Sequence, residues 1–276
     1  MFGDDLINLY ELRDLLMKVE IFPVRLPLIK KGDDIAELIV QNFEIEDGDI
    51  ISICSTIVSK AEGRVADLKS YKPDMKAIEI AKRLNKDPEF IQAVLDETDE
   101  ILLEYPFLLV RAKTGNVCVN AGVDVSNVER GKVVLPLRNP DEAAERIRKR
   151  IEDLCGKRVG VIITDTGGRC FRRGVVGFAV GVSGVRAIRN WIGKEDLYGN
   201  KLEITIECVV DEIAGFANLL MGEGNWGIPV VVFRGLADLI DRGSMRDVYR
   251  SEEEDIIRRC LRICRDTMDY SSGKSL

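Results

Sequence analysis

The sequence contains no histidine, and this absence limits the chemistry that the protein can carry out. Histidine is the commonest general base and metal-binding nitrogen in proteins. Any reaction here must therefore use carboxylates, hydroxyls, lysine, arginine, the backbone or a metal ion. Glutamine is also scarce, occurring only at Gln41 and Gln92, while charged residues make up 32 % of the chain. This bias favours a heat-adapted source.

The sequence also lacks a Cys-x-x-Cys motif, a long apolar run and a basic N-terminus. A membrane-spanning helix needs about 20 apolar residues, and a signal peptide needs a basic start. We therefore predict a cytoplasmic protein with no membrane segment. The cysteines are odd in number and lie mostly in apolar runs, which predicts buried, reduced thiols rather than a disulfide or zinc framework. They are Cys54, Cys118, Cys155, Cys170, Cys208, Cys260 and Cys264.

The chain also has no excess of positive charge. Its net charge is -7 and its pI is near 5.0. A nucleic acid would repel such a chain on approach, so we predict no nucleic-acid partner and no basic membrane-binding surface. The chain has 276 residues, of which 46 % are apolar. This is enough for a substantial core in one large domain or two interlocked smaller ones. Any boundary between them is expected near residues 70–105.

The apolar spacing predicts a mixed α/β architecture. We predict buried strands at 50–58 and 158–165, further strands at 174–184 and 228–233, a half-buried strand at 202–207, and a hairpin around Thr114-Gly115. Helices are predicted at 75–84, 88–104, 140–155 and 209–221, and after a capping box of Ser251 and Glu254. The glycines of 174–184 suggest that other backbone approaches this strand closely. Leucines in the first sixteen residues also have helical spacing.

Gly222, Gly224 and Gly227 have the G-x-G-x-x-G spacing of a dinucleotide-binding turn. Such a turn holds a pyrophosphate only where it leaves a strand and opens a helix. Here a helix is predicted before the glycines and a strand after them, so the sequence argues against a nicotinamide or flavin site. Two interpretations remain. The glycines form a helix cap and turn, or a flexible loop that wraps a nucleotide while Glu223 binds a cation.

Carboxylates follow predicted strands at separate places in the chain. Asp165, with Thr166 beside it, ends the strand 158–165, Asp124 follows the predicted hairpin, and Glu223 lies in the glycine-rich loop. Ligand sites in α/β proteins favour strand ends, and oxygen ligands suit Mg²⁺ or Mn²⁺ bound to phosphate. A turn or cap would also explain each carboxylate, since the sequence alone does not show that they converge.

Basic side chains lie near these positions in the sequence. Guanidinium groups grip phosphate or carboxylate, whereas a salt-bridged surface loop is the alternative. A lysine that follows two hydroxyl residues in the sequence is also able to bind phosphate oxygens. The alternative is an exposed lysine that merely follows a strand. The residues are Arg169, Arg172 and Arg173 in one stretch, and Lys60 behind Ser55 and Thr56 in another.

Long stretches of the chain resemble one enzyme family. They are LPLI (26–29), CSTIVSKAEGR (54–64), YPFLLVRAKTGNVCVNAGVDVSN (105–127), GVIITDTGGRCFRRGVVGFAVGVSG (160–184), NWIGKEDLYG (190–199) and DEIAGFANLLMGEG (211–224). In content and order these motifs closely resemble the coenzyme F-420-0:L-glutamate ligase family. The resemblance extends from about Met17 to Cys264.

The resemblance implies an archaeal GTP-dependent ligase that adds L-glutamate through γ-linkages to a deazaflavin coenzyme precursor. It implies an uncommon α/β fold that is neither Rossmann, P-loop nor ATP-grasp, assembled as an intertwined homodimer. The extent of the resemblance and the composition of the two ends together predict three parts of the chain. These are an N-terminal extension (1–16), a ligase domain (17–265) and a flexible tail (266–276).

The resemblance also implies roles for individual residues. Asp124 and Asp165 would bind one divalent cation, Mg²⁺ or Mn²⁺, and Thr166 with Glu223 a second, with K⁺ as a further cofactor. Lys60 and Asp165 would be catalytic, and the three arginines are candidates for anionic substrate groups. The implied GTP contacts are Leu26, Pro27, Leu28, Ile29, Ser55, Thr56, Lys60, Asn127, Met221, Gly222, Glu223, Gly224, Asn225, Trp226, Gly227 and Ile228.

A carboxylate and an amine do not condense in neutral water, so the acid must be activated. We expect the γ-phosphoryl group of GTP to move to the coenzyme carboxylate, giving an acyl phosphate that the glutamate amine attacks. Positioning and charge neutralisation carry such a transfer, so a chain without histidine can perform it. The alternatives are a GTP-binding regulatory module and a nicotinamide-dependent dehydrogenase, and neither accounts for the long shared motifs.

Overall fold

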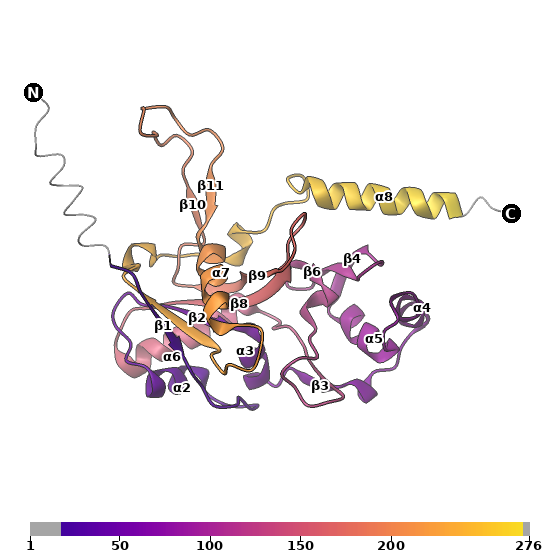
Figure 1. Ribbon diagram of the computed structural model, residues 1–276, viewed down its shortest axis with the longest axis horizontal. Helices are drawn as coiled ribbons and strands as arrows, with labels where there is room; N and C mark the ends of the chain where they lie inside the picture. The colour runs from indigo at the N-terminus through magenta and orange to yellow at the C-terminus, as the bar shows by residue number, and fades with distance from the viewer. Residues whose placement is uncertain (1–17, 273–276) are drawn as a thin grey trace, which may run out of the picture.

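The computed structural model describes residues 18–264 and the backbone of 265–272 (Figure 1). The predicted helix of the first sixteen residues lies outside this range. The helices are α2 (Ile35–Asn42), α3 (Ser55–Ala61), α4 (Met75–Leu84), α5 (Pro88–Asp96), α6 (Pro140–Cys155), α7 (Val209–Met221) and α8 (Ile256–Ser272). The strands are β1 (Glu20–Val24), β2 (Ile50–Cys54), β3 (Val65–Asp67), β4 (Thr98–Leu103), β5 (Leu109–Ala112), β6 (Val117–Val119), β7 (Lys132–Val134), β8 (Gly160–Gly168), β9 (Val175–Ser183), β10 (Ile188–Asn190), β11 (Ile206–Cys208) and β12 (Val230–Arg234).

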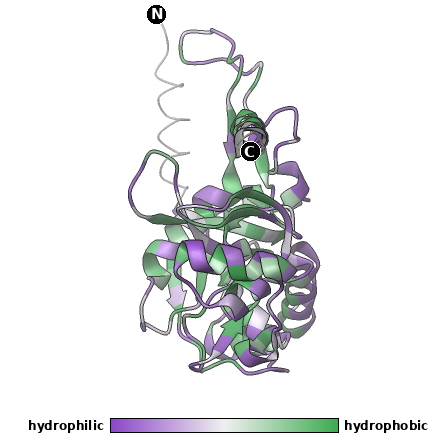
Figure 2. Cartoon of the chain, turned by 90° about the vertical axis from the view of Figure 1, so that its right-hand side faces the viewer, coloured by the Kyte–Doolittle hydropathy of each residue, from purple (hydrophilic) through white to green (hydrophobic). Residues whose placement is uncertain are grey.

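A five-stranded sheet with the order β1-β12-β2-β8-β9 forms the centre of the molecule. Only β2 and β8 pair in parallel, and the other neighbours are antiparallel. Successive side chains of a strand point to opposite faces, so Ile51 and Ile53 pack with α2 and α6, whereas Ile50 packs with α7. Burial of both faces explains why these strands are apolar almost throughout. Figure 2 shows the hydrophobic strands inside and hydrophilic residues on the outer helices and loops.

A separate hydrophobic core lies beside the central sheet. It is formed by α4, α5 and the antiparallel sheet β4-β5-β6, and its buried residues fall between Ala77 and Leu135. The short antiparallel ribbon of β3 and β7 connects this region to the rest of the chain. Arg64 crosses the same connection, because its Nε donates to the Pro136 carbonyl at 2.9 Å and its Nη2 to Glu97 at 2.8 Å.

Two elements project from the body in Figure 1. One is the arm, which we define as residues 188–208, the ribbon of β10 and β11 with its connecting loop. The other is α8, which contacts β4. Helix α8 covers residues 266–272 of the segment that we predicted as a flexible tail. Within residues 18–272, no helix is long and apolar enough to cross a membrane.

Most predicted elements are confirmed. Helices α4, α6 and α7 have the predicted ranges, and the hairpin forms around Thr114-Gly115. Gly156 caps α6 with a left-handed φ of 68°. Before α8, the Ser251 amide donates to the Glu254 carboxylate at 3.1 Å, which is one half of the predicted capping box.

Three predicted elements are wrong in their extent. The strand 50–58 ends at Cys54, because Ile57 and Val58 reach the core as part of α3. The helix 88–104 ends at Asp96, since the following residues pair with β5 as β4. The strand 202–207 is reduced to Ile206–Cys208 in the arm. Tertiary context overrides local propensity in each case.

The cysteine prediction is wrong for burial. Cys54, Cys118, Cys155, Cys170, Cys208 and Cys260 form no disulfide among the described residues. Cys170, Cys260 and Cys264 are exposed, however, and the other cysteines are half-buried. Cys170 lies in the loop between β8 and β9, and the other two lie on α8, which projects from the body. An apolar sequence context therefore did not ensure a buried position.

Candidate functional site

The register of the central sheet brings four distant segments to one edge. Val24 pairs with Val230, Val230 with Ile53, and Ile53 with Ile163. The chain leaves β1 and β2 at this edge and enters β12 there, whereas β8 continues beyond the edge to Gly168, so Asp165 does not end its strand as predicted. The segments concerned are 25–29, 55–60, 165–168 and 221–229.

A cleft of about 1640 Å³ opens between this edge and the β5–β6 hairpin. Its walls include Asp124, Asp165 and Glu223, the carboxylates singled out from the sequence. Thr166, Ser55 and Thr56 also line it. The sequence-predicted acidic residues therefore share one cleft although they are far apart in the chain.

The carboxylate of Asp165 is the electrostatic centre of this cleft. Burial raises its pKa to about 6, and the negative charges of Asp124 and Glu223 raise it as well. A hydrogen bond of 2.8 Å from the Thr166 amide acts in the opposite direction. Like charges raise a carboxyl pKa only at short range, so the contributions of Asp124 and Glu223 reflect the closeness of both carboxylates to Asp165. Thr166 extends the group, with its hydroxyl 3.5 Å from a Glu223 oxygen.

Asp124 is held by the backbone at the start of its loop. Its amide and carbonyl exchange hydrogen bonds of 3.0 and 2.8 Å with Val134 at the end of β7. Its side chain accepts hydrogen bonds from the amide and hydroxyl of Ser126. Gly122, just before it, has a φ of 76°, and a Cβ there would lie 3.8 Å from a carboxylate oxygen of Asp165. The turn therefore brings the two acidic residues to the same part of the cleft.

The glycine-rich loop, residues 222–228, connects α7 to β12. The Gly222 amide donates to the Asn218 carbonyl at 2.9 Å, and its φ of 66° ends the helix. The indole of Trp226 packs against Gly222, where a Cβ would lie 2.7 Å from the ring. Arg25 donates to the Trp226 carbonyl at 3.0 Å and so ties this loop to the segment after β1. A helix precedes the glycines and a strand follows them, which confirms the argument against a dinucleotide-binding turn.

The remaining predicted nucleotide contacts lie around the cleft rather than on its walls. Lys60 donates to the Asn127 carbonyl, so the predicted pair is in direct contact. Leu28 is 90 % exposed, whereas Ile29 is buried in the first core and could offer only its backbone to a ligand. Met221 is also buried in the core. Pro27, Gly224, Asn225, Gly227 and Ile228 lie in the two loops that Arg25 joins.

Two of the three arginines reach the cleft. Arg169 and Arg172 line it, while Arg173 is exposed and lies outside the lining. No ion pair involves these three residues among the interactions of the described chain. This disfavours the alternative of a salt-bridged surface loop.

The carboxylates do not by themselves form a closed metal cage. In the described part of the chain, no group of three or more His, Cys, Asp or Glu side chains is arranged to hold a metal ion. The donors that face the cleft are carboxylate and hydroxyl oxygens, which suit Mg²⁺ or Mn²⁺. Mg²⁺ commonly binds through one or two carboxylates, with phosphate and water as its other ligands.

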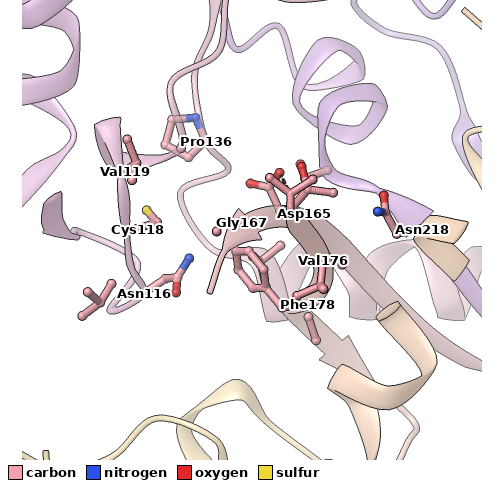
Figure 3. Close-up of a pocket in the computed structure, with 18 of the residues that line it drawn as sticks. Asn116, Cys118, Val119, Pro136, Asp165, Gly167, Val176, Phe178 and Asn218 are labelled. Atoms are coloured by element: carbon pink, nitrogen blue, oxygen red, sulfur yellow. Dashed lines mark hydrogen bonds between the residues drawn. The ribbon is translucent and has the colours of Figure 1, made fainter. Parts of the chain in front are cut away.

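Sequence reasoning missed several polar residues of the cleft. Asn116 and Asn218 face it from opposite walls (Figure 3), and Asn120 also lines it. Asn120 and Ala121 both have left-handed backbone, with φ of 54° and 53°. The Asn120 Oδ1 is buried, and no hydrogen-bond partner for it occurs among the described residues. The sequence Asn-Ala-Gly could have indicated this turn, since asparagine and glycine tolerate a left-handed backbone.

The sequence is similar to those of known proteins over most of its length. The family model for F420-0:gamma-glutamyl ligase matches residues 23–235, which include every carboxylate of the cleft described above. The coenzyme F420:L-glutamate ligase of Archaeoglobus fulgidus is 64 % identical over 249 residues, covering 90 % of this chain and 100 % of the relative. The enzyme of the same name from Methanosarcina acetivorans is 49 % identical, covering 89 % of this chain and 98 % of the relative. The one from Methanocaldococcus jannaschii is also 49 % identical, covering 87 % of this chain and 97 % of the relative. The chain therefore belongs to the F420-0:gamma-glutamyl ligase family of enzymes.

Proposed function

We propose that the protein uses GTP to join L-glutamate, through a γ-glutamyl linkage, to a precursor of the deazaflavin coenzyme F420. The relatives are named coenzyme F420:L-glutamate ligases. The observation that carries the proposal is the convergence of Asp124, Asp165 and Glu223 on one cleft. Three carboxylates that repel one another there make a favourable place for cations and the triphosphate they accompany.

The proposed reaction has two steps. The bond between the β–γ bridging oxygen and the γ-phosphorus of GTP breaks, and a new bond joins that phosphorus to an oxygen of the coenzyme carboxylate. The glutamate amine then attacks the carbon of this acyl phosphate, loses a proton, and phosphate leaves. The products are GDP, phosphate and the coenzyme extended by one glutamate.

Two divalent cations, Mg²⁺ or Mn²⁺, would neutralise charge on the transferred phosphoryl group. The donor chemistry of the cleft fits this role. In the proposal, Asp124 and Asp165 hold one cation, and Thr166 and Glu223 hold the other. Phosphate oxygens and water would supply the remaining ligands, since the described side chains alone do not enclose a metal ion. K⁺ remains a prediction from the resemblance.

The nucleotide is proposed to lie between the segment after β2 and the glycine-rich loop. Ser55 and Thr56 line the cleft on one side and Glu223 on the other. Lys60 contacts a phosphate after leaving the Asn127 carbonyl that it now touches. Arg169 and Arg172 line the cleft and are proposed to contact anionic groups of the coenzyme, whereas Arg173 does not line it and has no part in the proposal.

We also propose that two copies of the chain associate as a homodimer. The arm exposes large apolar side chains, among them Leu197, Tyr198 and Ile204, which are 101 %, 92 % and 86 % exposed. Such clustered apolar exposure is typical of a surface that a partner covers. A second copy is the partner that requires no further component.

The Asp165→Asn variant tests the proposed reaction. The substitution keeps the shape of the side chain and removes its charge, so glutamate-dependent phosphate release from GTP should fall by about 100-fold or more. Mass spectrometry should then detect no glutamylated coenzyme, while circular dichroism shows an unchanged fold.

Asp153→Asn is the matched control, because Asp153 is exposed on α6 and does not line the cleft. It should retain wild-type activity. Wild-type turnover in Asp165→Asn would rule out the role of this carboxylate. If the wild-type protein binds GTP without glutamate-dependent phosphate release, it is a nucleotide-binding module instead.

A further inference from the structure

The cleft is larger than one substrate requires. Pockets for small ligands usually enclose about 300 to 1,000 Å³, whereas this cleft has a volume of about 1640 Å³. Asp124, Asp165 and Glu223 form the acidic end at the edge of the sheet, and Asp211 and Glu212 of α7 line the cleft elsewhere. From the acidic end the cleft continues along β8 and β9 between surfaces of different chemistry.

An apolar floor begins directly beside Asp165. In the antiparallel pair of β8 and β9, Asp165 lies opposite Phe178, and Gly167 lies opposite Val176. Directly opposed residues project from the same face of a sheet. Phe178 and Val176 therefore extend the surface that starts at the Asp165 carboxylate.

Gly167 keeps this floor flat. A Cβ at that position would lie only 2.8 Å from the Phe178 ring, so the ring rests directly against the glycine backbone. Figure 3 shows Phe178 next to Gly167, with Asp165 on one side and Asn116 facing it across the cleft. Both Phe178 and Val176 are half-buried and line the cleft.

The β5–β6 hairpin adds apolar surface to the same cleft. Val117 and Val119 are two residues apart in β6, so they project from the same face of the strand. Both line the cleft and are 40 % and 43 % exposed. We call these valines together with Phe178 and Val176 the apolar strip. A flat, apolar molecule could lie along it, next to the Asp165 carboxylate.

We propose that the apolar strip binds the flat deazaflavin ring of the acceptor substrate and so directs the carboxylate of that substrate toward Asp165. The identity of the acceptor rests on the proposed function. Aromatic rings stack favourably on aromatic and apolar side chains, and the acidic end with its cations is where the reacting carboxylate must lie. The ring therefore occupies the part of the cleft that the triphosphate leaves open, and Phe178 determines specificity for it.

Titration of the full-length protein with the fluorescent coenzyme precursor, in the absence of GTP, tests this assignment. Phe178→Leu and Val117→Asn should each raise the dissociation constant for the precursor about five- to tenfold, because each removes part of the apolar contact. Binding of GTP with Mg²⁺, measured by calorimetry, should change less than about twofold.

Matched controls lie outside the cleft. Phe171→Leu changes a fully exposed phenylalanine in the loop between β8 and β9, and Ile78→Asn changes an exposed side chain on α4. Both should bind the precursor as the wild type does. Val117→Asn keeps the test valid if Phe178→Leu fails to fold, since Val117 is exposed on a hairpin.

The outcomes separate this inference from the proposed function. If the wild type forms the glutamylated product and both strip variants bind the precursor normally, the ring lies elsewhere and the inference is overturned. If precursor binding depends on the strip but no glutamate is incorporated, the ring site is supported and the proposed reaction fails.

Discussion

Glycine residues in β9 allow helices to approach both faces of the central sheet. A Cβ at Gly177 would lie 2.4 Å from the carbonyl oxygen of Ala214 in α7, and a Cβ at Gly181 would lie 2.6 Å from that of Pro140 in α6. The close backbone approach predicted from the sequence is thus confirmed at these two positions. Gly174 and Gly184, by contrast, have positive φ at the ends of the strand. The same residue type therefore serves two physical purposes within eleven positions.

Gly177→Ala should destabilise the protein. The new methyl group has no room against the α7 backbone, and overpacking of this kind costs about 1–3 kcal/mol. Chemical denaturation measures the change in the free energy of unfolding. Gly168→Ala, on the partner strand, is the control, since a Cβ there meets no atom within 4 Å. A Gly177→Ala variant as stable as the control would show that α7 moves away without cost.

Among the elements, helices and hairpins with a strong local pattern were predictable. The stretches that form α4, α6 and α7 have regular apolar spacing and local caps, and a hairpin turn is set by a few neighbouring residues. The helix predicted at 88–104 was wrong beyond Asp96, because β4 owes its form to pairing with β5. The β-branched run after Cys54 misled in the same way, because its helical form depends on a core assembled from distant strands.

The attachment of α8 depends on charge rather than on apolar packing alone. Arg258 and Arg262 of this helix both bind Glu100 on β4, and Glu252 accepts from the same arginines. The Arg262 hydrogen bond, ahead of that from Arg258, lowers the pKa of Glu100 to about 2 despite partial burial of the carboxyl. Arg258 is itself only 7 % exposed, so its charge needs this partner.

Glu100→Gln should therefore weaken the fold in a pH-dependent manner. The folded pKa of about 2 lies below the ordinary value of 4.5. The stabilisation is therefore complete above about pH 4.5, and it is lost as the pH falls toward 2. At pH 7 the variant should lose up to about 3 kcal/mol of unfolding free energy.

Denaturant titrations of wild type and variant between pH 3 and pH 7 give the comparison. Glu252→Gln is the control, since that side chain is 51 % exposed and should matter much less. A Glu100→Gln deficit that stayed constant over this pH range would contradict the ionic explanation.

At the scale of the whole molecule, the candidate site is a product of topology. Asp124, Asp165 and Glu223 were identified as candidates from the sequence, yet their convergence could not be predicted, because it depends on strand order and on how the β5–β6 hairpin faces the sheet. Conversely, Arg173 looked equivalent to its neighbours in the sequence but does not reach the cleft. The family resemblance supplied residue roles, and the structure supplies the cleft in which those roles can be tested.

The proposed homodimer should be visible in solution. Light scattering after gel filtration should give twice the chain mass of 30.9 kDa. A double variant of the arm, Leu197→Lys with Ile204→Lys, should shift the protein to the monomer, because charged side chains are costly in a buried apolar interface. Ile78→Lys on α4 should leave the dimer intact. A monomeric wild-type protein would refute the proposal.

The central claim is that three distant carboxylates gather cations and a triphosphate in one cleft. Anomalous X-ray diffraction from crystals grown with Mn²⁺ and GTP tests it most directly, since it locates the metal independently of any assumed ligand. We expect manganese peaks in contact with Asp124, Asp165 and Glu223, next to the phosphates of the nucleotide. Nucleotide and manganese bound together at a place that none of these carboxylates reaches would contradict the account.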